Sequence, residues 1–199
     1  GFGNDEITTG DGADDVIGDN GVIEYTDGAA VRLSTNDSEA GTTGTDTIIV
    51  SDGNNRVLAG LSGDSVTSTH GVDVVLGDNG ELSYANNILI KAVSSETALG
   101  GIDVLNLGDG DNVVIAGHAD DSVAVGNDND TVIGDNGEIN YSLAGVITDI
   151  QSTATDQGGD DEITITGGNN TVIAGFGNDE ITTGDGADDV IGDNGVIEY

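Results

Sequence analysis

Acidic and amide side chains recur in this chain at a spacing of nine residues. Twelve nonapeptides can be laid end to end in three runs of four, over residues 41–76, 98–133 and 156–191. The sixth position is Asp or Asn in all twelve, and the eighth is aliphatic in all twelve. The fourth is Gly in nine of them, with Ser62, Ala119 and Asp128 as the exceptions. This pattern predicts a six-residue turn followed by a short strand whose one aliphatic side chain points inward.

Carboxylates at the sixth position suit a hard cation. Two nonapeptides are expected to form one coil of about 18 residues, and coils stack by parallel strand pairing ~4.8 Å apart. Two stacked carboxylates in a Gly-rich loop repel each other unless a cation lies between them. Calcium accepts about six to eight oxygen ligands in loose geometry, whereas magnesium requires an octahedron and zinc prefers Cys or His. The stacked pairs expected to bind calcium are Asp46 with Asp64, Asp103 with Asp121 and Asp161 with Asp179.

Longer repeats organise the nonapeptides. Residues 1–25 and 175–199 are identical, at an offset of 174 residues. The tetrapeptide GDNG occurs four times, about 58 residues apart, so three diverged units make one period of a tandem array. We expect the chain to be an excerpt of a longer polypeptide or a processed product. The predicted limits are 1–60, 61–117 and 118–175 for the units and 176–199 for the start of the next period.

A different kind of segment follows each GDNG. Residues 22–40, 81–97 and 138–155 alternate in the manner of strands, and a break of small residues divides each one. We predict a β-hairpin that caps or flanks each block of coils. The sequence leaves open whether these hairpins interrupt the roll. All four tyrosines fall at equivalent places in these segments, where packing against the roll is favoured over ligand binding: Tyr25, Tyr84, Tyr141 and Tyr199.

The charge of the chain excludes several classes of partner. There are 38 acidic and 3 basic residues, for a formal net charge of −35. Without a basic patch the chain is not expected to bind nucleic acid or an anionic membrane. No apolar run approaches the length of a membrane span, and no Cys is available for disulfides. Cations are the partners that this charge requires, and their binding should be coupled to folding.

The nonapeptides resemble the RTX (repeats-in-toxin) calcium-binding repeat, Gly-Gly-x-Gly-x-Asp-x-aliphatic-x. The best match is Ala174–Thr182 followed by Thr183–Ile191, and the likeness extends over the twelve nonapeptides. It implies an all-β fold, a right-handed parallel β-roll (β-solenoid) with calcium between the loops. The ligand positions implied by the resemblance are Asp5, Asp14, Asp46, Asp64, Asp73, Asp103, Asp121, Asp130, Asp161, Asp179 and Asp188.

Some positions depart from this motif. The second nonapeptide of every unit has Asn at position six, and we expect weaker calcium sites, or sites partly filled by water, at Asn55, Asn112 and Asn170. Each GDNG is interpreted first as a tight Asn-Gly turn that opens the hairpin. Its aspartates are secondary ligand candidates: Asp19, Asp78, Asp135 and Asp193. About three or four Ca²⁺ ions per unit would nearly neutralise the chain.

No pattern of catalytic residues stands out, and we predict that the chain is not an enzyme. His70 and His118 both fall at turn position three, where other repeats carry unrelated residues, so they are interpreted as exposed turn residues. Arg32, Arg56 and Lys91 are interpreted as isolated surface charges. Acidic pairs that recur in every coil indicate a regular, repeated arrangement rather than a single catalytic cleft.

These features favour a calcium-stiffened structural segment of a very long secreted bacterial protein. Its predicted role is the rigid shaft of an extracellular filament or giant surface adhesin, exported by type I secretion. Its expected partners are further copies of the same repeat, end to end or packed in a filament. Two alternatives remain: the calcium-dependent module of a type I secreted toxin or hydrolase, and a surface-layer subunit.

Overall fold

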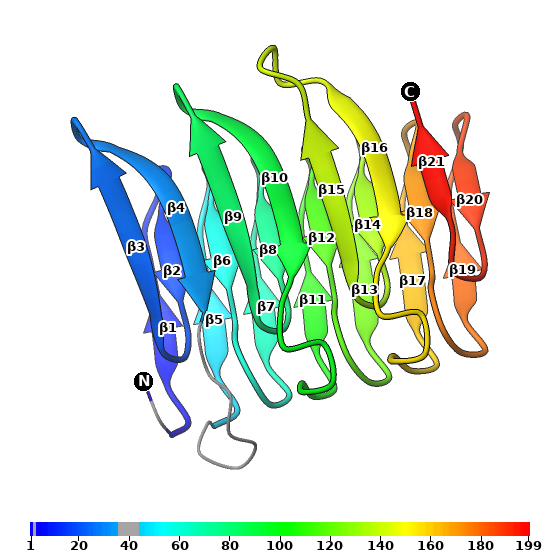
Figure 1. Ribbon diagram of the computed structural model, residues 1–199, viewed down its shortest axis with the longest axis horizontal. Helices are drawn as coiled ribbons and strands as arrows, with labels where there is room; N and C mark the ends of the chain where they lie inside the picture. The colour runs from blue at the N-terminus through cyan, green and yellow to red at the C-terminus, as the bar shows by residue number, and fades with distance from the viewer. Residues whose placement is uncertain (2, 36–43) are drawn as a thin grey trace.

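The computed structural model is a row of stacked coils with hairpins along one side (Figure 1). It describes residue 1, residues 3–35 and residues 44–199, and the described residues form strands and turns without a helix. The end of the first predicted flanking segment, residues 36–40, lies outside the described residues, as do residues 41–43 of the first complete nonapeptide. The prediction of an all-β parallel roll is confirmed.

Each coil contributes one strand to each of two parallel sheets, with seven strands per sheet in the described part of the chain. Sheet A contains β1 (Glu6–Thr8), β5 (Thr47–Ile49), β7 (Ser65–Thr67), β11 (Val104–Asn106), β13 (Ser122–Val125), β17 (Glu162–Ile165) and β19 (Glu180–Thr182). Sheet B contains β2 (Asp15–Ile17), β6 (Arg56–Leu58), β8 (Val74–Leu76), β12 (Val113–Ile115), β14 (Thr131–Ile133), β18 (Thr171–Ile173) and β20 (Asp189–Ile191).

The roll runs unbroken past the hairpins. β7 pairs with β11 with Val66 opposite Leu105, although a whole hairpin separates them in sequence. The predicted aliphatic side chains at position eight fill the space between sheets A and B, as Ile48 and Val114 illustrate with no exposed surface. Position one also faces this core, for example Val50, because side chains alternate along an extended chain.

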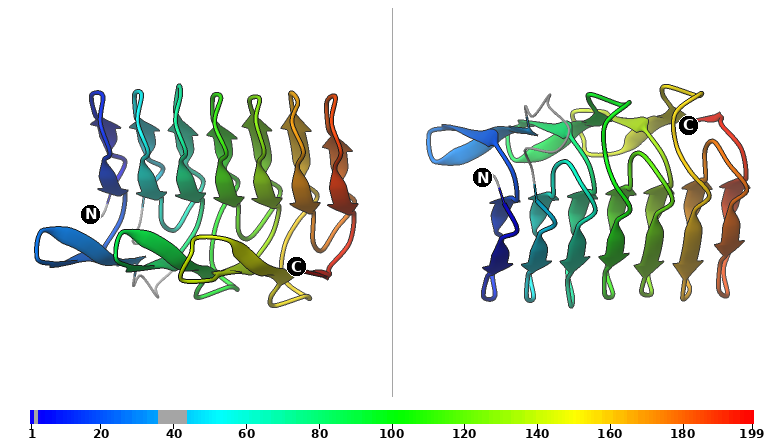
Figure 2. Two further views of the ribbon diagram at one scale, coloured as in Figure 1. Left: turned by 90° about the horizontal axis from the view of Figure 1, so that it is seen from above. Right: turned by 90° about the horizontal axis from the view of Figure 1, so that it is seen from below.

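The hairpins join one another into a third, antiparallel sheet (Figures 1 and 2). Sheet C has seven strands among the described residues, in the order β21, β16, β15, β10, β9, β4, β3. Their bounds are β3 (Gly21–Thr26), β4 (Ala29–Thr35), β9 (Gly80–Ala85), β10 (Ile88–Ser94), β15 (Gly137–Tyr141), β16 (Ile147–Ser152) and β21 (Val196–Glu198). The hairpins therefore flank the roll as one continuous layer, rather than capping separate blocks.

A second hydrophobic core holds sheet C against sheet B. Position nine of the sheet B nonapeptides carries Leu or Ile, and Leu76 and Ile133 are buried there. Leu82 and Ile139 of sheet C face them and have no exposed surface. The outer face of sheet A has no such cover, and Val104 is 40% exposed. The fold thus has three layers and two cores.

Basic side chains connect neighbouring elements, so their interpretation as isolated surface charges is wrong. Arg32 on β4 pairs with Glu24 at 3.0 Å in its own hairpin and with Glu81 at 3.2 Å in the next one. Lys91 on β10 reaches the following hairpin at Glu138, 2.8 Å away. Arg56 pairs with Asp15 one coil away at 2.5 Å, and its guanidinium lies 4.8 Å from the centre of the Tyr84 ring. Each cation joins two repeats.

The exceptional residues at position four predict a stabilising substitution. Ser62, Ala119 and Asp128 all adopt positive φ, at 81°, 88° and 91°. A side chain in this region costs about 1–2 kcal/mol, which glycine avoids. We expect Ala119→Gly to raise the free energy of unfolding by about 1 kcal/mol in calcium, measured by chemical denaturation. Ala124→Gly in β13 should instead lower it by about 0.5–1 kcal/mol, and equal effects at the two sites would contradict this explanation.

Candidate metal centres

An unbroken line of aspartates follows the loops that lead into sheet A. The backbone N–H of each position-six residue donates to Oδ1 of the aspartate in the next coil, at N···O distances of 2.6–3.0 Å. The three stacked pairs expected from the sequence are brought together, and bonds across the hairpins connect them. The members of this aspartate column are Asp5, Asp46, Asp64, Asp103, Asp121, Asp161 and Asp179.

A second line follows the loops that lead into sheet B, with the same backbone bonds at 2.8–3.1 Å. Here aspartate and asparagine alternate strictly from coil to coil. The members of this mixed column are Asp14, Asn55, Asp73, Asn112, Asp130, Asn170 and Asp188. All of the position-six residues proposed as ligands thus lie in one of two columns, and their role as ligands stays a prediction.

The second carboxylate oxygen of these aspartates fits a cation. In the middle of the aspartate column the side chains are almost fully buried, with Asp103 at 0% and Asp121 at 2% exposure. Oδ1 accepts the backbone N–H, whereas Oδ2 is buried and accepts no hydrogen bond among the described residues. A buried carboxylate oxygen without a donor is costly, and a bound cation would relieve that cost. The Oδ2 atoms concerned belong to Asp14, Asp46, Asp64, Asp73, Asp103, Asp121, Asp130, Asp161 and Asp179.

The electrostatics of the aspartate column point the same way. Burial raises the pKa of Asp64 to about 8 and that of Asp161 to about 8. Burial, followed by the charge of Asp103, raises the pKa of Asp121 to about 10. The pKa of Asp103 itself is raised well above its ordinary value by burial and by the charge of Asp78. Without a counter-ion, these groups would have to give up their charge near neutral pH.

No side chain supplies that counter-ion. The three basic side chains form their ion pairs elsewhere. Among the described residues, no three His, Cys, Asp or Glu side chains converge as metal ligands. Calcium would therefore take carboxylate oxygens together with backbone carbonyls. The Gly77 corner provides such a place, since a Cβ there would overlap both Asp103 Oδ2 and the Ala116 carbonyl oxygen.

The GDNG aspartates have a different set of contacts. Asp78 Oδ1 accepts the N–H of Gly101 at 3.2 Å, and its Oδ2 accepts the N–H of His118 at 2.6 Å. Asp135 binds the N–H groups of Gly159 and Phe176 in the same way. Each of these buried carboxylates thus joins the loop after one hairpin to the loop one coil further on. Asp19 is also buried and accepts the N–H of Leu61, whereas Asp193 in the last coil is exposed. Calcium binding by these four aspartates stays a prediction.

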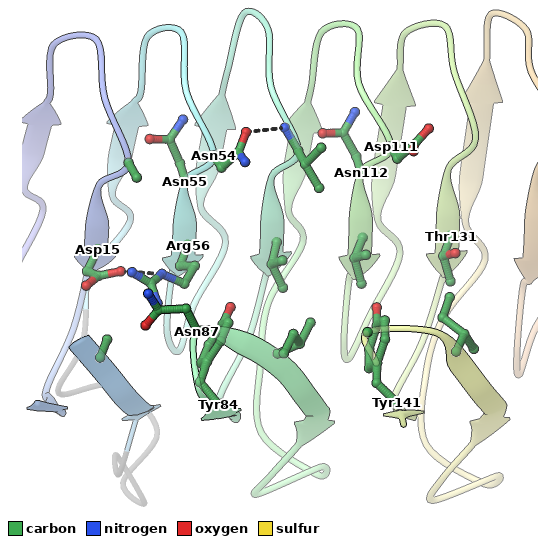
Figure 3. Close-up of a pocket in the computed structure, with 18 of the residues that line it drawn as sticks. Asp15, Asn54, Asn55, Arg56, Tyr84, Asn87, Asp111, Asn112, Thr131 and Tyr141 are labelled. Atoms are coloured by element: carbon green, nitrogen blue, oxygen red, sulfur yellow. Dashed lines mark hydrogen bonds and ion pairs between the residues drawn. The ribbon is translucent and has the colours of Figure 1, made fainter. Parts of the chain in front are cut away.

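A groove of about 1070 Å³ runs between the loops beside sheet B and the hairpin turns (Figure 3). Tyr84 and Tyr141 line it and pack against the second core, as expected for packing residues. Tyr25 and Tyr199 are more exposed, and their hydroxyls bond to Asp15 and Thr171.

Both histidines lie in loops of the roll. His70 is an exposed turn residue, as expected, and its Nδ1 lies 3.1 Å from Asp52 Oδ1. His118 is half-buried, contrary to the expectation of full exposure, because its loop packs against Asp78.

The described part of the chain has no helix of the length and apolarity that a membrane span requires.

Two parallel sheets joined by Gly-rich loops with buried carboxylates define a parallel β-roll with cation-binding loops. The family model of the RTX calcium-binding nonapeptide repeat matches this chain in four copies, over residues 1–22, 40–75, 97–132 and 164–196. These matches cover more than half of the chain, which therefore belongs to the RTX calcium-binding nonapeptide repeat family. No curated protein and no solved structure matches it.

Membership of this family confirms the calcium prediction in its general form. RTX repeats bind calcium, they are structural rather than catalytic, and they occur in secreted bacterial proteins. The chain is accordingly a calcium-binding repeat region of a secreted protein. The buried Oδ2 atoms identify the loops of the roll as the part of this chain that is suited to the ion.

Proposed function

We propose that this chain is a segment of a rigid, calcium-stiffened shaft in an extracellular filament or giant surface adhesin. The observation that carries the proposal is the identity of residues 1–25 and 175–199 combined with three sheets that run the full length of the roll. A module that only accompanies a catalytic domain does not need successive periods of identical sequence, whereas a shaft gains length from each copy.

The registers of sheet C support continuation from one period to the next. β4 and β9 pair with Leu33 opposite Leu82, and β16 and β21 pair with Ile150 opposite Ile197. The first strand of the next period thus adds to the sheet as the hairpins within a period do. Further copies of the repeat are the partners that these edges would take, joined end to end in one chain.

Export by type I secretion is part of the same proposal. The net charge of −35 and the buried carboxylates favour an unfolded chain when calcium is scarce, as it is inside cells. An unfolded chain suits passage through a narrow channel. Calcium outside the cell would then drive folding.

Length per period tests the shaft. The hairpins do not separate the blocks, so a period contains six coils and should add about 29 Å at ~4.8 Å per coil. We compare proteins of one, two and four periods by small-angle X-ray scattering in calcium. Their maximum dimension is expected to grow by this increment for each added period. A radius of gyration that grows like that of a compact globule would contradict the proposal, as would identical scattering with and without calcium.

A further inference from the structure

The asparagines of the mixed column make contacts that no aspartate of either column makes. Asn55 has 0% exposure, and Asn112 and Asn170 have 1%. In each, Oδ1 accepts the backbone N–H of the preceding coil, from Asp14, Asp73 and Asp130 respectively. Because that oxygen faces a donor, Nδ2 must point to the other side, into its own loop (Figure 3 shows the first two).

Nδ2 binds oxygens of the loop that ends in the same asparagine. Asn112 Nδ2 donates to the carbonyls of Gly108 at 3.0 Å and Gly110 at 2.9 Å. Asn55 Nδ2 donates to the carbonyls of Ser51 and Gly53, both at 3.2 Å. These acceptors are positions two and four of the nonapeptide.

The third asparagine repeats part of this pattern. Asn170 Nδ2 donates to the Gly168 carbonyl at 3.3 Å, which is again position four. It also donates to Asp188 Oδ1 in the next coil at 2.9 Å, and Asn55 Nδ2 reaches Asp73 Oδ1 at 3.0 Å in the same way. The amide group therefore takes up loop carbonyls and a carboxylate oxygen of the coil above.

These oxygens are of the kind that a calcium ion between two loops would use. An N–H donor and a cation cannot both occupy the same side of a carbonyl. In aspartate-ended loops, by contrast, the equivalent atom is an Oδ2 with no hydrogen bond among the described residues, as in Asp64 and Asp121. The asparagine loops have their oxygens satisfied, and they carry no buried charge at position six that needs a counter-ion.

We propose that Asn55, Asn112 and Asn170 are built-in replacements for calcium. The loops 50–55, 107–112 and 165–170 close on an amide group instead of an ion. In one loop of four, therefore, the position-six side chain binds no calcium. The sequence-based expectation of weaker calcium sites at these asparagines is thereby replaced by an expectation of none. The inference concerns the ion count and holds whether or not the chain is a shaft.

The aspartate column and the mixed column should therefore respond differently to calcium. Every loop leading into sheet A ends in an aspartate, whereas alternate loops leading into sheet B are closed by an amide. Sheet B also packs on the second core with sheet C. The metal-free chain should therefore retain protection longest along sheets B and C.

The test restores the missing carboxylates. In the triple variant Asn55→Asp, Asn112→Asp and Asn170→Asp, calcium per chain, counted by native mass spectrometry and by equilibrium dialysis, should rise by one ion for each substituted loop. The matched control is Asn54→Asp, Asn129→Asp and Asn169→Asp, which adds the same charge at exposed residues in position five of three nonapeptides and should leave the count unchanged. Hydrogen exchange of the metal-free wild type at pH 5, where the calcium-free chain is expected to be most stable, should be slower at position-six amides of asparagine loops than of aspartate loops.

Two results would overturn the proposal. One is a calcium count for the wild type that already equals the number of loops between stacked coils, the asparagine loops included. The other is an equal count for the triple variant and its control, with unchanged hydrogen exchange. Should the triple variant fail to fold, Asn112→Asp alone decides the matter, by adding one ion or none.

Discussion

In calcium-free buffer, the roll is expected to lose stability steadily as the pH is raised from 5 to 9. The folded chain holds Asp64 and Asp161 with pKa values of about 8 and Asp121 with a value of about 10. In the unfolded chain the same carboxyls have ordinary values of about 3.9. The folded state therefore binds more protons than the unfolded state throughout this range, and each rise in pH favours unfolding.

Saturating calcium should reverse this trend. The ion binds ionised carboxylates, so protons compete with it and stability should rise between pH 5 and pH 8. Thermal unfolding followed by far-UV circular dichroism, with and without calcium, measures both slopes. The comparison starts at pH 5 because the sequence pI is about 4.1 and solubility falls near it. If stability changed with pH in the same way with and without calcium, the explanation by buried aspartates that need a counter-ion would be contradicted.

The second large effect is expected from removing two adjacent members of the aspartate column. Asp103→Ala with Asp121→Ala deletes the acceptors of two backbone N–H groups, bound at 2.6 Å and 2.8 Å. Each buried N–H left without a partner costs about 1–3 kcal/mol, before the loss of calcium ligands is counted. We expect the calcium midpoint of folding, measured by calcium titration followed by far-UV circular dichroism, to rise at least about tenfold, since ~1.4 kcal/mol corresponds to a factor of ten.

The control removes two carboxylates that face solvent. Glu162→Ala with Glu180→Ala makes the same change in net charge on the outer face of β17 and β19, where both side chains are exposed. Its calcium midpoint, measured by the same titration, should stay within about twofold of the wild type or fall, because exposed charges contribute little. If both double variants shift the midpoint equally, net charge rather than the column governs folding.

The period of nine contains enough information to predict the roll. An aliphatic residue at position eight and an oxygen-bearing residue at position six recur without exception. Chain geometry then fixes which residues stack, as Asp46 and Asp64 do. Continuation across a hairpin was not predictable from spacing alone. The bond from Asp64 to Asp103 spans 39 residues, whereas stacking within a unit spans 18.

Sheet C was predicted only as separate hairpins. Alternation locates each strand of a hairpin, but it does not say which hairpin edges meet. Position nine carries the signal for this third layer. It is Leu or Ile in the repeats of sheet B, such as Leu58 and Ile115, but Thr67 and Asn106 illustrate its variety in sheet A. One face of the roll is therefore built to be covered.

The side-chain partners of the basic residues and asparagines could not be read from the sequence. Lys91 and Glu138 are 47 positions apart and meet only because two hairpins pair. The direction of the Asn112 amide depends on a donor from the coil below and carbonyls of its own loop. Sequence reasoning correctly found position six, but the chemistry of the amide emerged only from these contacts.

Crystals grown in calcium and measured at a long X-ray wavelength test most directly whether cations hold the coils together. Anomalous density is expected beside the Oδ2 atoms of Asp64, Asp103, Asp121 and Asp161, each of which is at most 2% exposed. After chelation at pH 8, the same protein should lose the circular dichroism signal of its sheets. A chelated protein that keeps every coil ordered, with no density beside these oxygens, would contradict the account.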